Sequence, residues 1–141
     1  MPAHPHRTLS RVEKARLRHL VEAVERETGV EIAALVVPHV QDVEGFAAAY
    51  FDRVGIGKRG RDNGVLVLVV TDRRLVRIEV GRGLGVAVSP PAARRIIEDV
   101  MAPQFRLGRY GEGLLRGVEA LGHLVAAAHA RGTERPADPA R

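Results

Sequence analysis

Cysteine is absent from this chain of 141 residues, and only two serines are present, Ser10 and Ser89. The lack of cysteine excludes disulfide bonds, zinc sites with thiolate ligands and thiol nucleophiles. Neither serine lies in a Gly-x-Ser-x-Gly motif, which argues against a serine nucleophile. Aromatic residues make up only 4% of the chain and no known nucleic-acid-binding motif is present, so a nucleic acid is the least favoured partner.

Long apolar stretches are absent as well. The longest uninterrupted apolar runs contain six residues, whereas a membrane-spanning helix needs about twenty. The first residues, from Met1 to His6, lack the basic and apolar regions of a secretory signal peptide. We therefore expect a chain with no membrane span that is cytoplasmic as given. An extracytoplasmic or membrane-anchored location is the alternative if the sequence was cut from a longer precursor.

Positive charge is concentrated in one part of the sequence. The net charge is +5, and between Arg53 and Arg82 eight basic residues stand against three acidic ones, whereas the remaining residues balance. Such a region attracts phosphate groups, nucleotides or anionic lipids. The other interpretation is a solvated basic face that reflects the general preference of this chain for arginine over lysine, twenty against two.

Hydrophobic periodicity predicts one α/β domain over residues 8–130, with disordered ends at 1–7 and 131–141. The predicted helices cover 10–27, 42–54, 89–102 and 111–128, and the predicted strands cover 32–37, 65–70 and 75–80. The helix between the first two strands implies a parallel crossover, whereas the short polar link before the third strand predicts an antiparallel hairpin. Pro103 is expected to end or kink the third helix. The elements give a small mixed sheet with helices on its faces.

The most informative stretch is the loop of residues 56–64, which is basic, rich in glycine and followed by an apolar strand. A loop at the end of a sheet can present polar groups to a ligand, and we predict that Lys58, Arg61 and Asn63 bind one. The carboxylate of Asp62 beside the amide oxygen of Asn63 is typical of a site for a hard cation such as Ca²⁺ or Mg²⁺. The alternative is a plain turn, in which both side chains form local hydrogen bonds.

Two charged residues alternate with apolar ones in the last predicted strand. Arg77 and Glu79 share one face, where they either form a surface ion pair or, under a cleft, hold an anion and exchange protons. The link 81–85 that follows repeats glycine around Arg82, and such links can wrap a phosphate, although the Walker lysine and the Rossmann context are missing. We predict that Arg77 and Arg82 bind the ligand, with Asp62 and Glu79 as the catalytic candidates.

Several motifs follow one another in a fixed order: Ile56-Gly57-Lys58-x-Gly60-x-Asp62-Asn63-Gly64-Val65-Leu66, Val76-Arg77-Ile78-Glu79-Val80-Gly81-x-Gly83-Leu84, Ala93-x-x-Ile96-Ile97-x-x-Val100-Met101-x-Pro103-x-Phe105 and Gly117-Val118-Glu119-Ala120-Leu121. In this order, over residues 8–125, they resemble the TPM domain, a family named for thylakoid acid phosphatase-like, photosystem-repair and acetylcholine-receptor modulator proteins. The resemblance implies a three-layer α/β/α sandwich with a crevice at the sheet end. It also implies a phosphatase-like activity with divalent cations bound by acidic residues.

Three departures from the family pattern weaken the implied cation site. The family commonly has a tyrosine, a glutamate and an aspartate where this chain has Arg82, Gly85 and Pro90. Asp62 then has few acidic partners, and Ca²⁺ affinity rises with the number and charge of the ligands. We therefore expect a non-catalytic binding or regulatory module that docks a protein or a phosphate-containing small molecule through its basic crevice. The alternative is a divalent-cation-dependent phosphatase, with Asp62 at the metal and Arg77 or Arg82 at the phosphate.

Overall fold

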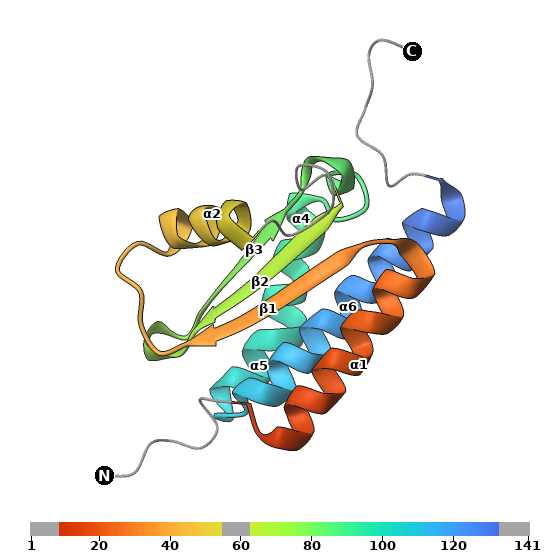
Figure 1. Cartoon of the computed structure of the whole chain (residues 1–141). Helices are drawn as coiled ribbons and strands as arrows, with labels where there is room; N and C mark the ends of the chain where they lie inside the picture. Colours follow the sequence, from red (N-terminus) through yellow and green to blue (C-terminus); the bar gives the residue numbers. More distant parts are fainter. Residues whose placement is uncertain (1–8, 55–62, 133–141) are drawn as a thin grey trace.

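The computed structural model describes residues 9–54 and 63–132, which form a three-layer α/β/α sandwich around a three-stranded sheet (Figure 1). The helices and strands follow in the order α1 (Arg11–Thr28), β1 (Glu31–Val37), α2 (Val43–Val54), β2 (Gly64–Val70), β3 (Leu75–Val80), α4 (Pro90–Arg95), η4 (Ile96–Met101), α5 (Ala102–Arg106) and α6 (Tyr110–Arg131). One-turn helices follow β2 and β3, namely η2 (Thr71–Arg73) and η3 (Arg82–Leu84). Of the predicted disordered ends, residues 1–7 and 133–141 lie outside the described residues. The described helices are all too short or too polar to cross a lipid bilayer.

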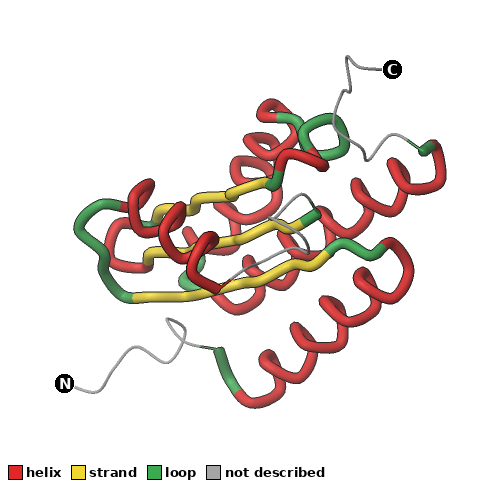
Figure 2. The backbone as a smooth tube through the Cα atoms, turned by 45° about the horizontal axis from the view of Figure 1, so that its top comes forward, coloured by secondary structure: helices red, strands yellow, loops and turns green. Residues whose placement is uncertain are grey.

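β2 is the central strand of the sheet. β1 pairs with it in parallel, with Glu31 opposite Gly64, and β3 pairs with it antiparallel, with Val65 opposite Val80. Every residue of β2 is buried, because α2 covers one face of the sheet and the other helices cover the opposite face (Figure 2). The parallel crossover and the antiparallel hairpin expected from the sequence are therefore both confirmed.

Alternation along the strands divides the core into two clusters. The larger cluster lies between the sheet and helices α1, α4, α5 and α6, and the smaller one lies under α2, where Phe51 packs against Leu66 and Leu68. Four apolar residues at helical spacing on α6 are fully buried in the larger cluster: Leu114, Val118, Leu121 and Val125. The sheet is thus packed against α6 on one face and against α2 on the other.

The first helix begins where the sequence predicts. The Ser10 hydroxyl accepts a hydrogen bond from the Glu13 N–H at 3.1 Å, and the Glu13 carboxylate accepts one from the Ser10 N–H at 3.0 Å. This reciprocal capping box satisfies two of the backbone donors that a helix start leaves unpaired. Ser89 caps α4 similarly, because its hydroxyl accepts from the Ala92 N–H at 3.3 Å.

The third predicted helix does not end near Ala102, so of the two expectations for Pro103 the helix end is wrong. Instead the π-helical η4 leads into α5, and the helical path passes through Pro103 as far as Arg106. In η4 the Ala102 N–H donates to the Ile97 carbonyl, five residues back, as a π turn requires. Pro103 then lies in the first turn of α5, where a helix tolerates the missing N–H.

Glu112 joins α1 to α6. Its carboxylate accepts from Arg116 Nε at 2.9 Å, one turn further along α6, and lies 3.5 Å from Nη1 of Arg16 on α1. The hydrogen bond from Arg116, helped by the charges of both arginines, lowers the pKa of Glu112 against the opposing effect of burial. The resulting stabilisation is present above the unfolded-state pKa and is lost as the pH falls through the lowered folded-state pKa.

We therefore expect Glu112→Gln to lower the free energy of unfolding near neutral pH, by less than about 1 kcal/mol because the carboxylate is only partly shielded from water. At a pH well below the lowered folded-state pKa, where the carboxylate is protonated in the folded and the unfolded chain, the variant and the wild type should be equally stable. Urea unfolding at both pH values measures this. An equal loss of stability at both would show that the charge of Glu112 is not what joins the helices.

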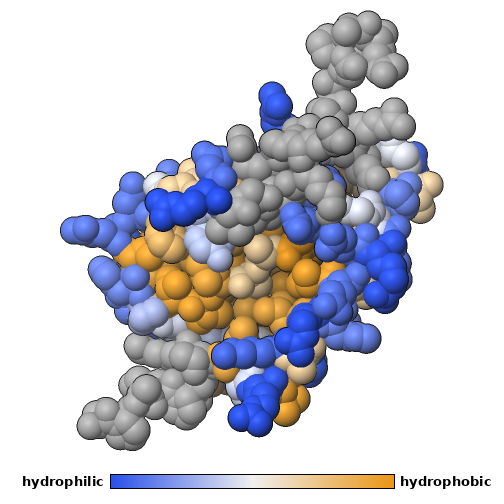
Figure 3. All heavy atoms as spheres, in the orientation of Figure 1, coloured by the Kyte–Doolittle hydropathy of each residue, from blue (hydrophilic) through white to orange (hydrophobic). Residues whose placement is uncertain are grey.

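The two edges of the sheet differ in character. β1 has no charged side chain between Ile32 and Val37, and a hydrophobic surface lies over it between α1 and α2 (Figure 3). Phe46 and Tyr50 of α2 stack with ring centroids 6.0 Å apart and are only partly buried. Of the three aromatic residues of α2, Phe51 is the one that is buried. β3, the other edge, carries the charged residues.

Candidate functional site

The residues predicted to form the site divide into two sets. Three of the predicted residues lie outside the described part of the chain, so their roles stay predictions: Lys58, Arg61 and Asp62. The others are described, and they lie where β2 begins and along the second half of β3: Asn63, Arg77, Glu79 and Arg82. The beginning of β2 and the end of β3 are neighbours because the two strands are antiparallel.

Asn63 fixes the start of β2. Its side-chain N–H donates to the Gly29 carbonyl at 2.6 Å, and its backbone carbonyl accepts from the Glu31 N–H at 3.0 Å. Gly29 ends α1 with φ +78°, a conformation that favours glycine. Asn63 therefore ties the beginnings of β1 and β2 together through residues distant in the sequence, and the bond of its side chain to Gly29 is not one of the local hydrogen bonds of a plain turn. Its contact with a ligand stays a prediction.

Arg77 and Glu79 form an ion pair on the face of β3 toward α2. Nε and Nη2 of Arg77 both donate to Oε1 of Glu79, at 3.2 and 3.0 Å. The arginine side chain is 41% exposed and the glutamate 26%, so the pair is half-buried at the border of the layer that α2 forms. The geometry agrees with the ion-pair interpretation of this strand. Their roles in anion binding and proton transfer stay predictions.

A cavity of about 490 Å³, here named the strand-end cavity, lies between the end of β3 and the last turns of α2. Three charged side chains line it: Asp52 from α2, Glu79 from β3 and Arg82 from η3. The position of α2 depends on Phe51, which is buried against β2. Two carboxylates and one guanidinium, from three different elements, thus line the same polar cavity.

Asp52 is the charged lining residue that the sequence analysis does not identify. The helix around it was expected, but its rotation on the sheet was not. The spacing of Ala48, Phe51 and Asp52 places all three on one side of a helix, so the burial of Phe51 is the signal from which the position of Asp52 follows. The sequence alone does not show which of the three aromatic residues of α2 is buried. The structure shows that it is Phe51, and not Phe46 or Tyr50.

The carboxylates of Asp52 and Glu79 are ligands that Ca²⁺ or Mg²⁺ accepts. Arg82 lines the same cavity, however, and Oε1 of Glu79 already accepts from Arg77. Among residues 9–54 and 63–132, no three acidic or histidine side chains lie together as a metal site would need. Asp62 lies outside these ranges, so the cation site that the resemblance implies stays a prediction.

A groove of about 630 Å³, here named the edge groove, runs between the free edge of β3 and the helical column of α4 and η4. It meets the strand-end cavity at residues 79–82, which line both. Gly85 and Pro90, which stand where the family commonly has acids, line the edge groove and not the strand-end cavity. A Cβ at Gly85 would meet only the Arg82 carbonyl oxygen, at 3.8 Å, so the backbone leaves room for a side chain there.

Comparison with known proteins agrees with this architecture. The family model described as TPM domain matches residues 4–124. The solution structure of the N-terminal domain of a protein from P. gingivalis has 30% sequence identity and a TM-score of 0.78, over 92% of this chain and 82% of that one. The structure of the BA42 protein from the psychrophilic bacterium Bizionia argentinensis has 21% identity and a TM-score of 0.73, over 94% and 87%, and shows the same fold. A comparison with curated proteins finds no match. Since the family model covers most of its length, the chain belongs to the TPM domain family.

Proposed function

We propose that this TPM domain is a non-catalytic binding module whose strand-end cavity takes a phosphate-containing anion at Arg82. The observation that carries the proposal is the position of Arg82, which lines both the cavity and the groove where β3 ends. A guanidinium offers a planar set of donors that matches the oxygens of a phosphate group. The stretch between Arg53 and Arg82 carries a net positive charge, which favours anions, although Arg73 and Arg74 lie at the opposite end of β3 from the cavity.

The other described side chains of the cavity favour binding over catalysis. Both donors of Arg77 are aimed at one oxygen of Glu79, which makes this carboxylate an ion-pair partner. The lining residues that the structure describes include no serine, threonine, cysteine or histidine to attack a phosphate ester. The role of Glu79 in this proposal is to pair with the charge of Arg77 on β3, and it needs no part in catalysis.

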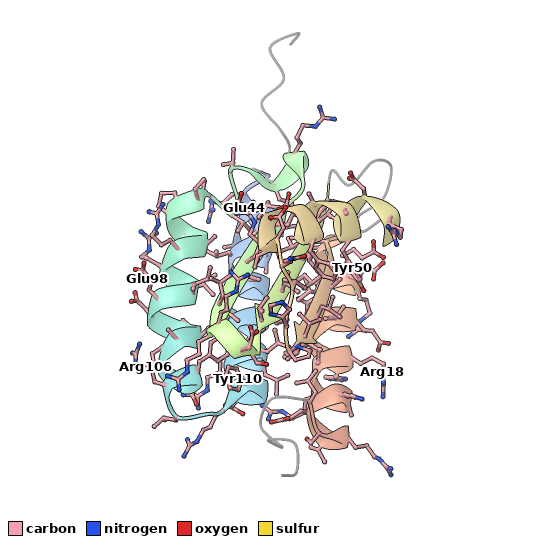
Figure 4. All side chains as sticks on the ribbon, turned by 90° about the vertical axis from the view of Figure 1, so that its left-hand side faces the viewer. Arg18, Glu44, Tyr50, Glu98, Arg106 and Tyr110 are labelled. Atoms are coloured by element: carbon pink, nitrogen blue, oxygen red, sulfur yellow. The ribbon has the colours of Figure 1, made fainter. Side chains whose placement is uncertain are left out.

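Isothermal titration calorimetry with inorganic phosphate tests the proposal. Arg82→Ala should weaken phosphate binding roughly tenfold or more, because a hydrogen bond to a charged group contributes about 1.5–3 kcal/mol. Arg18→Ala is the matched control, since it removes the same charge from an exposed position on α1 (Figure 4). Equal phosphate affinity in the two variants, or no binding by the wild type, would contradict the assignment.

A divalent-cation-dependent phosphatase is the second candidate, and one observation favours it. Asp52 and Glu79 come from different elements and line the same cavity as Arg82. Carboxylates that hold a cation, beside an arginine that holds phosphate, form the kind of site that hydrolyses phosphate esters with a metal-activated water. Hydrolysis of p-nitrophenyl phosphate in Mg²⁺ or Ca²⁺ that is lost in Asp52→Asn would establish this alternative. If p-nitrophenyl phosphate is not hydrolysed with either ion, the phosphatase alternative is wrong and the non-catalytic binding module is the interpretation that remains.

A further inference from the structure

On the free side of β3, no backbone group is paired with another strand among residues 9–54 and 63–132. The Gly81 N–H donates to the Gly64 carbonyl of β2 at 2.8 Å. Backbone groups of a strand point alternately to its two sides, so Val76, Ile78 and Val80 direct their N–H and C=O groups away from β2. In the part of the chain that the structure describes, no strand lies on that side of β3. Such a row of donors and acceptors is a template on which another strand can pair.

Helices face these backbone groups of β3 across the edge groove. The column of α4, η4 and α5 stands beside β3 (Figure 4). Ala93 and Ile97, one turn apart on this column, bring partly buried apolar side chains to the groove. An extended segment in the groove would turn every second side chain toward one face, so alternate apolar residues would contact Ala93 and Ile97. A sheet edge opposite a helix is the arrangement in which strand addition gains affinity from the backbone and specificity from alternate side chains.

Charge divides the edge groove along its length. Arg82 and Arg94 lie toward the end where β3 finishes and α4 begins, with the neutral residues Gly85 and Pro90. Arg77 and Glu79 also line the groove, but their opposite charges are paired with each other. Glu98 lies one turn further along the column (Figure 4). A segment with a negative group at the arginine end and no acidic residue beside Glu98 is therefore complementary to the groove, which favours one orientation of the bound chain.

We propose that the edge groove binds an extended segment of a partner protein as a fourth strand along β3. This segment carries apolar side chains at alternate positions and an acidic side chain or C-terminal carboxylate at Arg82 and Arg94. The inference goes beyond the phosphate site, because its contacts lie along β3 and the helical column. Binding of a peptide here does not require that phosphate bind in the strand-end cavity.

A library of random hexapeptides, screened against the full chain, tests the proposal. The enriched peptides should alternate apolar with other residues and should carry an acidic group at one end. The strongest binder should lose roughly tenfold or more in affinity to Arg94→Glu. It should bind Arg95→Glu as it binds the wild type, because Arg95 is exposed on the same helix and is not part of the groove. No enriched peptide, or equal losses in both variants, would overturn the proposal.

Amide hydrogen exchange identifies the occupant of the edge. In the peptide complex the amides of Val76, Ile78 and Val80 should exchange more slowly than in the free chain, because they donate to the added strand. Protection that rises with protein concentration in the absence of peptide would assign the edge to a second copy of this chain and overturn the peptide proposal. Phosphate binding is measured separately on Arg82→Ala, so a failure there is distinguishable from a failure of the groove.

Discussion

Replacement of Leu114 by alanine is expected to lower the free energy of unfolding by about 2–5 kcal/mol. The Leu114 side chain is 0% exposed and lies in the larger core cluster, with residues of the sheet and of α1 and α6. Truncation removes apolar contacts and leaves a cavity, because the surrounding helices and the sheet can relax only partly. Urea unfolding followed by circular dichroism measures the loss.

Leu107 provides the matched control for this substitution. Its side chain is 63% exposed after the last turn of α5, so Leu107→Ala removes the same atoms from a position in contact with water. The expected change is within about 0.5 kcal/mol, as is usual for surface substitutions. If both alanine variants lost the same stability, the assignment of α6 to the centre of the core would be wrong.

The second large effect is expected for Gly113→Ala at the contact of α6 with α5. A Cβ at Gly113 would lie 2.8 Å from Cδ1 of Phe105 and 3.2 Å from Cβ of Gln104. The Phe105 ring is buried and stacks on Tyr110, with centroids 5.0 Å apart, so it has little room to move. Overpacking of this kind costs about 1–3 kcal/mol, which exceeds the gain of up to about 1 kcal/mol from replacing a helical glycine.

Gly85→Ala separates this packing effect from a general effect of losing glycine. Gly85 has φ −62°, and an added Cβ there reaches only ordinary contact distance. We expect no loss of stability in this variant, and a small gain is consistent with a less flexible unfolded chain. A melting temperature for Gly113→Ala equal to that of the wild type would show that α5 and α6 do not approach as closely as described.

Much of the fold could be predicted because its signals are local. The run of apolar residues in β2 predicts a strand buried on both faces, and alternation in β3 separates Ile78 from Arg77. The capping box of Ser10 and Glu13 fixes the start of α1. The continuation of the helical path past Pro103 was not predictable. Proline is a plain sequence signal for the end of a helix, whereas the π turn that precedes Pro103 has no comparable signal.

The site was less predictable, because it depends on how elements pack. The sequence places Arg77 and Glu79 on one face, but whether they bind each other or a ligand depends on what covers that face. The contribution of Asp52 follows from the rotation of α2 on the sheet, and that rotation is decided by the packing of Phe51 against Leu68 and its neighbours. Arg94 enters the edge groove only because α4 runs back along β3.

An amide-resolved NMR titration with inorganic phosphate, repeated with Ca²⁺, tests the central claim most directly. We expect phosphate to shift the amides of residues 81–85, together with that of Asp52, and Ca²⁺ to leave them unchanged. Shifts of Asp52 and Glu79 with Ca²⁺ and none with phosphate would contradict it and indicate a cation site. If neither phosphate nor Ca²⁺ shifted any amide, the proposed phosphate site would also be contradicted, since the strand-end cavity would then bind neither ion.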